Sequence, residues 1–238
     1  FGAHPTFLPE SALSFPEVDL ILRGEPEAVL VPVLDRLARR EAPDALPGLG
    51  WKCGGEIRAG TAAPPVENLD DLPFLDTGLL SPRLDYFNPL VTHYPYLTLE
   101  TSRGCPGRCA FCAAPRFYGP RIRAKSVLRV VEEMEHYRRQ GYRELYFRDE
   151  TFTFSRDRTG ALCERILARN LRIPWIANAR VGDLDLDLMR LMKQAGCHYL
   201  KFGLESGVQE ILDRSHKGIQ VATAASDLAL ARKAGLDT

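Results

Sequence analysis

The sequence lacks several features that would define large classes of protein. No apolar run approaches the ~20 residues that a membrane-spanning helix needs, and no basic segment followed by an apolar one marks a secretory leader. Charge of one sign is not in excess, because 31 Lys and Arg residues balance 31 Asp and Glu residues. We therefore expect a folded cytoplasmic protein with no membrane span and no global signal for nucleic acid.

Cysteine is scarce, with six among 238 residues, and without a secretory leader a disulfide framework is not expected. Three of the six nevertheless fall within eight positions, in the stretch GCPGRCAFC, as Cys105-x3-Cys109-x2-Cys112. Such crowding indicates metal or redox chemistry. Cys163 lies on the apolar face of an expected helix and Cys197 starts an expected strand, so both are interpreted as buried structural thiols.

Methionine is absent from the first position, and the last residues, KAGLDT, interrupt an apparent repeat, so we expect an internal piece of a longer protein. Residues 1–42 contain a strand and a helix, which Pro32 is expected to break. Residues 43–95 hold eight prolines and a hairpin with its turn at Gly54-Gly55, a composition typical of a linker.

Strand and helix patterns alternate from residue 96 onward. This alternation predicts an α/β fold with a parallel sheet and right-handed crossovers. Four units are too few for a closed barrel of the usual size, so further units are expected beyond Thr238. The expected strands are 96–100, 142–148, 173–179 and 197–203, and the expected helices are 126–140, 158–170, 186–195 and 223–235.

The cysteine trio directly follows the first of these strands, at the edge where α/β sheets place their chemistry. Thiolates are soft ligands suited to iron–sulfur clusters or zinc. A structural zinc site or an electron-transfer cluster needs four protein ligands, whereas three thiolates on a four-iron cluster leave one iron open. A zinc site with His93 or Cys163 as a distant fourth ligand is the alternative.

The stretch CPGRCAFC, with Phe111 before the third cysteine, resembles the cluster loop of the radical S-adenosylmethionine (SAM) superfamily. The resemblance covers roughly residues 91–238 and implies a partial (β/α) barrel with a [4Fe-4S] cluster on Cys105, Cys109 and Cys112. It further implies that SAM chelates the fourth iron beside Phe111 and is cleaved to a 5′-deoxyadenosyl radical. No catalytic residue is assigned beyond the cluster.

Polar residues follow the next three strands in positions that resemble the family's cofactor contacts. They are Asp149 and Glu150 in FRDETF, Asn178 and Arg180 in NARVGD, and Glu205 and Ser206 in FGLESG. The resemblance implies that one of the two adjacent carboxylates binds the SAM amino group, and it leaves open which one. An arginine fork suits the SAM carboxylate, and a surface pair of Arg180 with Asp183 or Asp185 is the alternative.

The first residues carry a second resemblance. The order GAHPTFLPE, then RGE, then a proline-rich connector resembles the tail of a doubly wound cobalamin-binding domain, which precedes the radical domain in one subfamily. It implies cobalamin beside Gly2 and His4. Residues 1–42 are accordingly expected to be the remnant of this domain, residues 43–95 a linker, and residues 96–238 the radical SAM core.

Together these resemblances imply an enzyme of the cobalamin-binding (class B) radical SAM subfamily. It would transfer a methyl group to, or cyclise, an unactivated carbon of a small-molecule substrate, with a flavodoxin or ferredoxin as its reducing partner. Two alternatives stay open: a methylthiotransferase-like radical enzyme, and a non-catalytic iron–sulfur or zinc-binding module.

Overall fold

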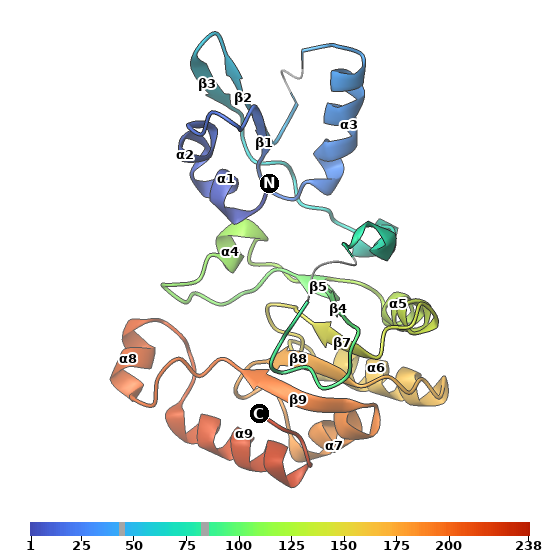
Figure 1. Cartoon of the computed structure of the whole chain (residues 1–238). Coiled ribbons are helices and arrows are strands. Elements are labelled where there is room, and N and C mark those ends of the chain that lie inside the picture. Colours follow the sequence, from blue (N-terminus) through green and yellow to red (C-terminus); the bar gives the residue numbers. More distant parts are fainter. Residues whose placement is uncertain (43–45, 82–85) are drawn as a thin grey trace. The chain divides into compact units, whose positions relative to one another are not determined.

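The structure of the chain is a computed structural model that describes residues 1–42, 46–81 and 86–238 (Figure 1). The chain folds into two compact units. The first consists of residues 1–67 and 112–121, and the second consists of residues 68–111 and 122–238. Pro43 and Pro82 of the proline-rich segment lie outside the described residues.

The first unit is built on a three-stranded antiparallel sheet with the order β1-β2-β3. Its elements are α1 (Ala3–Phe7), α2 (Pro9–Leu13), β1 (Leu20–Leu22), α3 (Glu27–Ala38), β2 (Leu49–Cys53), β3 (Glu56–Ala59) and α4 (Ala114–Phe117). Cys53 pairs with Glu56 across Gly54 and Gly55, whose φ angles of 58° and 86° favour glycine. The predicted hairpin is therefore confirmed.

The boundaries expected near residues 42 and 95 do not coincide with the boundary between the compact units. Strand β2 pairs with β1, with Leu20 opposite Trp51, so the hairpin belongs to the same unit as the first strand. Residues 68–95 group with the parallel sheet instead, and Tyr137 Oη accepts a hydrogen bond from Leu75 N at 2.6 Å. The assignment of residues 1–42 to a cobalamin-binding domain stays a prediction.

Helix α3 runs through Pro32 without a break, so the expected interruption is wrong. Pro32 is exposed, whereas Val29 and Val33 are buried. The proline removes one backbone hydrogen bond on the solvent side, where water can satisfy the freed carbonyl group. Packing of the apolar face is untouched, and the helix continues.

The second unit contains a four-stranded parallel sheet with the order β4-β7-β8-β9. Its strands are β4 (Tyr96–Leu99), β7 (Glu144–Phe147), β8 (Trp175–Ala179) and β9 (Cys197–Phe202), and its helices are α5 (Val127–Arg139), α6 (Arg156–Ala168), α7 (Leu186–Gln194), α8 (Gln209–Arg214) and α9 (Val221–Lys233). Short elements complete it: η1 (Leu69–Asp71), η2 (Thr77–Leu79), β5 (Ser102–Arg103) and β6 (Arg123–Ala124). Every strand and helix predicted after residue 96 is present, and α8 was not predicted.

Local side chains explain where these helices begin and end. The side chains of Ser126, Ser155 and Asp185 accept backbone N–H groups in the first turns of α5, α6 and α7. Gly141 and Gly196 follow α5 and α7 with φ angles of 97° and 100°, a region that glycine enters without strain.

Helices α5, α6, α7 and α9 pack on one face of the sheet, and side chains from both layers form the main core. Phe147, Phe152 and Trp175 are fully buried there, with ring centroids 5.0 to 5.6 Å apart. Leu212 of α8 belongs to a separate small cluster with Val181 and Ile219. The opposite face of the sheet carries a smaller cluster around Tyr146 and Ile176. Strands with helices on a single side are the arrangement of a partial (β/α) barrel, as predicted.

The described sheet is open. Strand β4 lies at one edge, and at the other edge Asp237 adds a single parallel bridge to Tyr199 of β9. Because all four strands run parallel, their carboxyl ends lie at the same end of the sheet. The loops that follow these carboxyl ends are where a site is expected. Within the described ranges, no helix has the length and apolar character to cross a bilayer.

Candidate functional site

The three cysteines lie in a loop beyond the carboxyl end of β4, and we call residues 104–112 the cysteine loop. Strands β5 and β6 pair antiparallel around it, with Ser102 opposite Ala124. Gly104 begins the loop with a φ angle of 101°, which suits glycine. Residues 104–111 belong to the second unit, and Cys112 begins the segment 112–121 that groups with the first.

Two of the thiols gather around Gly107. A Cβ atom at this position would lie 3.2 Å from Cys105 Sγ and 3.8 Å from Cys109 Sγ. The backbone N–H of Gly107 donates to Cys105 Sγ at 3.4 Å. A side chain at residue 107 would crowd both sulfur atoms, so glycine leaves that space open to a bulky ligand.

The thiols of the cysteine loop are half-buried, unlike the other three in the chain. Cys163 and Cys197 lie fully buried in the main core, as predicted. Burial raises the pKa of Cys163 to about 12 and the pKa of Cys197 well above its usual value. Cys53 is exposed at the end of β2. The cysteine loop therefore combines access for a ligand with partial shelter from water.

The described residues contain no group of three or more His, Cys, Asp or Glu side chains that is already arranged to hold a metal ion. The trio is a candidate through its spacing, its exposure and Gly107. Neither residue suggested as a fourth zinc ligand lies at the cysteine loop. His93 Nδ1 is 3.2 Å from Glu144 Oε2, at the amino end of β7, and Cys163 is part of the core.

Two adjacent carboxyl groups follow β7, and their surroundings differ. Asp149 is buried and accepts hydrogen bonds from Thr101 N, Thr101 Oγ1 and Ser102 Oγ, each at 2.6 Å. Burial raises the pKa of Asp149 in spite of these hydrogen bonds. Glu150 is exposed, and partial desolvation together with the charges of Glu100 and Asp149 raises its pKa. Glu150 is thus the carboxyl group that a ligand can reach.

Asn178 links the carboxyl ends of two neighbouring strands. Its Nδ2 donates to the backbone carbonyl of Asp149 at 2.8 Å, and its Oδ1 accepts from Tyr146 Oη at 3.1 Å. Both ends of the amide are therefore already hydrogen-bonded within the sheet.

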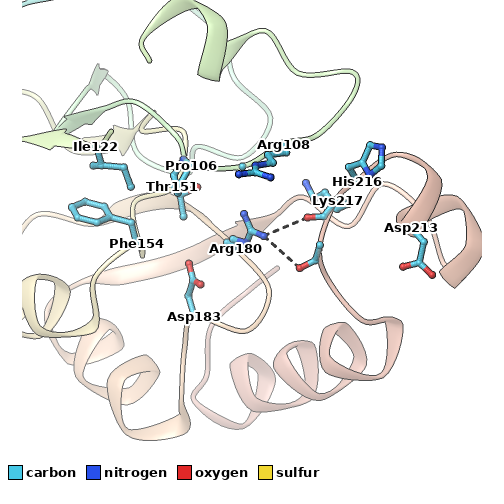
Figure 2. A pocket seen from close by; sticks show the side chains of 12 residues that line it. Pro106, Arg108, Ile122, Thr151, Phe154, Arg180, Asp183, Asp213, His216 and Lys217 are labelled. Atoms are coloured by element: carbon cyan, nitrogen blue, oxygen red, sulfur yellow. Dashed lines mark hydrogen bonds between the residues drawn. The ribbon is translucent and has the colours of Figure 1, made fainter. Parts of the chain in front are cut away.

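Arg180 lies beside the cysteine loop (Figure 2). Its Nη2 donates to the backbone carbonyls of Lys217 and Gly218, both at 3.4 Å. Its Nη1 lies close to Gly107, because a Cβ atom placed on that glycine would be 3.6 Å away. Asp185, one of the partners suggested for Arg180 from the sequence, pairs instead with Arg156 at 2.9 Å.

Glu205 follows β9 with a φ angle of 63°, which is uncommon for a residue other than glycine. Its Oε1 lies 3.0 Å from Lys217 Nζ. Lys217 Nζ also lies 5.8 Å from the ring centroid of Phe111, and Ala110 N donates to the carbonyl of Ser215 at 2.9 Å. The loop after α8 therefore contacts the cysteine loop at two points.

Sequence reasoning did not identify Lys217 as a site residue. It belongs to a short segment between α8 and α9 that carries no motif. A lysine directly before Gly218 is the local feature that could have drawn attention to it. Ser206 was identified, and its Oγ accepts from Val208 N at 3.0 Å, which closes a local turn.

Several of these residues line a cavity of about 830 Å³ within the second unit (Figure 2). Its walls come from residues 106–108 of the cysteine loop, the loops after β7 and β8, and the segment 213–218. Arg180 and Lys217 bring positive charge to it, and Asp183 brings a carboxyl group whose pKa is raised by burial. The size and the mixed charge suit a small polar ligand that carries both signs of charge.

In the first unit, the two stretches that suggested cobalamin lie together. Thr6 Oγ1 donates to the carbonyl of Gly2 at 2.6 Å and accepts from Gly24 N at 2.9 Å. Arg23 Nη2 donates to the carbonyl of Thr6 at 3.1 Å. His4 is exposed on α1. The stretches GAHPT and RGE are thus neighbours in space, which is compatible with one binding surface.

The sequence matches the model of a protein family described as the radical SAM superfamily over residues 99–238. The chain belongs to the radical SAM superfamily, whose enzymes use a [4Fe-4S] cluster and SAM.

Its relatives include methyltransferases and cyclases. The chain is 34% identical to an uncharacterized methyltransferase from Pyrococcus horikoshii, over 99% of this chain and 51% of the relative. It is 30% identical to the anaerobic magnesium-protoporphyrin IX monomethyl ester cyclase from Rubrivivax gelatinosus, over 91% of this chain and 40% of the relative. The chain therefore spans about half the length of these relatives, or less.

The fold is similar to that of the cobalamin-dependent SAM radical enzyme OxsB, with a TM-score of 0.80 and 24% identity. The similarity covers 99% of this chain, both units included, and 35% of OxsB. It supports the architecture of a partial (β/α) barrel.

Proposed function

We propose that the chain is part of a radical SAM enzyme in which Cys105, Cys109 and Cys112 hold a [4Fe-4S] cluster. One observation carries the proposal: three half-buried thiols lie within eight positions of the loop that follows the first strand of a parallel sheet, two of them around a glycine. Three thiolates leave one iron of such a cluster open. When bound, the cluster and SAM supply the radical that removes hydrogen from an unactivated carbon.

The residues at the strand ends bind and orient SAM. Glu150 is exposed and lies near Glu100, so it offers negative charge to the SAM amino group. Arg180 offers guanidinium donors to the SAM carboxylate from the wall of the cavity. The exposed ring of Phe111 lies beside Lys217 and offers an apolar surface to SAM.

Glu205 is assigned to the hydroxyl groups of SAM, since a carboxylate accepts hydrogen bonds and its ion pair with Lys217 holds it next to the cavity. Asn178 and Ser206 contribute indirectly in this proposal. Asn178 joins two strand ends, and Ser206 closes the turn that follows Glu205.

For the reaction, we propose methyl transfer to, or cyclisation of, an unactivated carbon of a small molecule. The methyltransferase and cyclase relatives support both outcomes. Cobalamin is proposed to bind near Gly2 and His4, with the likeness to OxsB and the adjoining GAHPT and RGE stretches in support. A flavodoxin or ferredoxin is proposed as the electron donor, and the cytoplasm as the location, because accessible thiols stay reduced there.

Anaerobic reconstitution of the full-length protein tests the proposal. We expect about four irons per chain and formation of 5′-deoxyadenosine when SAM and a strong reductant are added. Iron without any 5′-deoxyadenosine would instead support a non-catalytic iron–sulfur module. Transfer of sulfur to the product would support the methylthiotransferase alternative.

Cobalamin is tested separately, by the corrin absorbance of the protein purified with and without added hydroxocobalamin. We expect about one cobalamin per chain and a weaker retention in the His4→Ala variant. A protein that retains no corrin, yet forms 5′-deoxyadenosine, would be a radical SAM enzyme of another subfamily.

A further inference from the structure

Asp149 is a buried carboxyl group whose side-chain hydrogen bonds lead to Thr101 and Ser102, at the base of the cysteine loop. It is 1% exposed. Both of its oxygens accept short hydrogen bonds, Oδ1 from Thr101 N and Oδ2 from Thr101 Oγ1 and Ser102 Oγ. Burying a carboxyl group opposes folding unless it is well hydrogen-bonded, so its presence here calls for a reason.

Thr101 is the point where several elements converge. It is fully buried, and besides Asp149 it is held by Arg158 of α6, whose Nη2 donates to its carbonyl at 3.2 Å and to its Oγ1 at 3.1 Å. Lys125 N donates to the same carbonyl at 2.9 Å. Residues from three separate stretches of chain thus fix one residue that lies four positions before Cys105.

The short chain segment between Thr101 and Cys105 links this fixed residue to the thiols. Ser102 pairs with Ala124 in the β5–β6 ladder, and Gly104 then turns the chain with a positive φ angle. A change in the direction of residues 101–102 is therefore carried through a short, turned segment to Cys105. Hydrogen bonds to a carboxylate are directional and stronger than neutral ones, so Asp149 restricts that direction more than a neutral group would.

We propose that Asp149 is a positioning residue for the cluster: it sets the path of the cysteine loop through Thr101 and Ser102 and does not contact SAM. The proposal rests on the proposed function, because it assigns Asp149 a role toward the cluster. It also separates the two adjacent carboxyl groups, since Glu150 is exposed whereas the side chain of Asp149 is hydrogen-bonded to the protein.

The Asp149→Asn variant keeps the volume of the side chain but replaces one acceptor oxygen by a donor. Glu144→Gln is its matched control, because Glu144 is also a buried carboxyl group of the β7 segment but lies at the other end of the strand. Both variants are made in the full-length protein. Hydrogen exchange of residues 101–105 is measured before reconstitution, and iron content and the electron paramagnetic resonance (EPR) spectrum afterwards.

We expect exchange at residues 101–105 to rise about tenfold in Asp149→Asn, since a broken charge-assisted hydrogen bond weakens local protection. After reconstitution this variant should bind less iron and give a broadened EPR spectrum. Glu144→Gln should match the wild type in all three measurements. Wild-type exchange and a wild-type EPR spectrum in Asp149→Asn would overturn the positioning role.

A second pair of variants keeps the test decisive if Asp149→Asn does not fold. Thr101→Val removes the hydroxyl donor to Asp149, and Thr101→Ser retains it. We expect Thr101→Val to reproduce the broadened spectrum and Thr101→Ser to restore the wild-type one; identical spectra for the two would contradict the role. If wild-type protein binds no iron, the proposed function fails, whereas normal iron and EPR in all variants would overturn the positioning role alone.

Discussion

The two ends of strand β7 carry buried carboxyl groups that differ in almost everything else. Glu144 begins the strand and Asp149 follows its end. Burial alone would raise the pKa of Glu144, but hydrogen bonds from His198 and from the backbone of Thr92 and His93 outweigh it and lower this pKa to about 2. Burial prevails at Asp149 and raises its pKa, despite hydrogen bonds from Ser102 and Thr101.

This difference separates a carboxyl group whose ionised form stabilises the fold from one whose ionised form the fold disfavours. A lowered pKa means that the folded protein favours the ionised Glu144, so that end of the strand contributes stability at neutral pH. A raised pKa means that the folded protein disfavours the ionised Asp149, so the ionised form of this group lowers the stability of the fold.

The largest expected effect is at the cysteine loop itself. Replacing Cys109 by alanine should abolish cluster binding, because two thiolates cannot hold the cluster in place of three. Cys53→Ser, which changes an exposed cysteine of the first unit, should bind as much iron as the wild type. Iron and sulfide analysis after anaerobic reconstitution measures both, and iron retained in Cys109→Ala would remove this residue from the ligand set.

At the amino end of β7, Glu144→Gln should lower the free energy of unfolding by about 2–3 kcal/mol, the usual loss when a buried hydrogen-bonded charge is removed. Iron content at 25 °C should not change, because the substitution is remote from the cysteine loop. Urea unfolding with an unchanged slope is the measurement. A loss of iron that exceeds the loss of folded protein would show that the two ends are not independent.

Arg180→Lys should weaken SAM binding about tenfold, because an ammonium group cannot replace the two-pronged guanidinium. Stability should change little, since the hydrogen bonds of Arg180 to backbone carbonyls are long. Equilibrium binding of SAM to the reconstituted protein measures the effect, with Arg156→Lys as the exposed control. Equal affinity in the Arg180→Lys and wild-type proteins would exclude a carboxylate contact.

The smallest expected effect concerns pH: the contributions of Glu144 and Asp149 to stability should change in opposite directions as the pH falls. The stability that Glu144 contributes is present above its unfolded pKa of about 4.3 and is lost as the pH falls toward 2. The contribution of Asp149 is present below its unfolded pKa and is lost as the pH rises through its raised folded pKa.

Comparing each variant with the wild type measures how the contribution of its carboxyl group to stability depends on pH. With falling pH, the stability difference between wild type and Glu144→Gln should shrink, whereas the difference between wild type and Asp149→Asn should grow. Unfolding is followed in urea at a series of pH values. Parallel curves for the two variants would contradict the opposite pKa shifts.

Much of the second unit could be predicted from the sequence because its signals are local. Ser126 and Gly141 mark the ends of one helix within a few residues of the apolar pattern they enclose. The cysteine spacing is equally local. Pro32 misled the prediction because the solvent exposure of a helix face depends on packing that a short window does not contain.

The different surroundings of Asp149 and Glu150 could not be predicted. They depend on hydrogen bonds to residues 47 and 48 positions away. The contacts of Lys217 with Glu205 and Phe111 likewise join residues that the sequence pattern does not bring together. The pairing of the hairpin with β1 joins stretches that are distant in sequence, so composition alone assigned it to a linker.

The proposed function requires that the three cysteines leave one iron open for SAM. The most direct measurement is the EPR spectrum of the reduced, reconstituted full-length protein before and after SAM is added. We expect a [4Fe-4S] signal whose g values shift on addition of SAM. A cluster signal that SAM leaves unchanged would contradict it, because the fourth iron would then be closed.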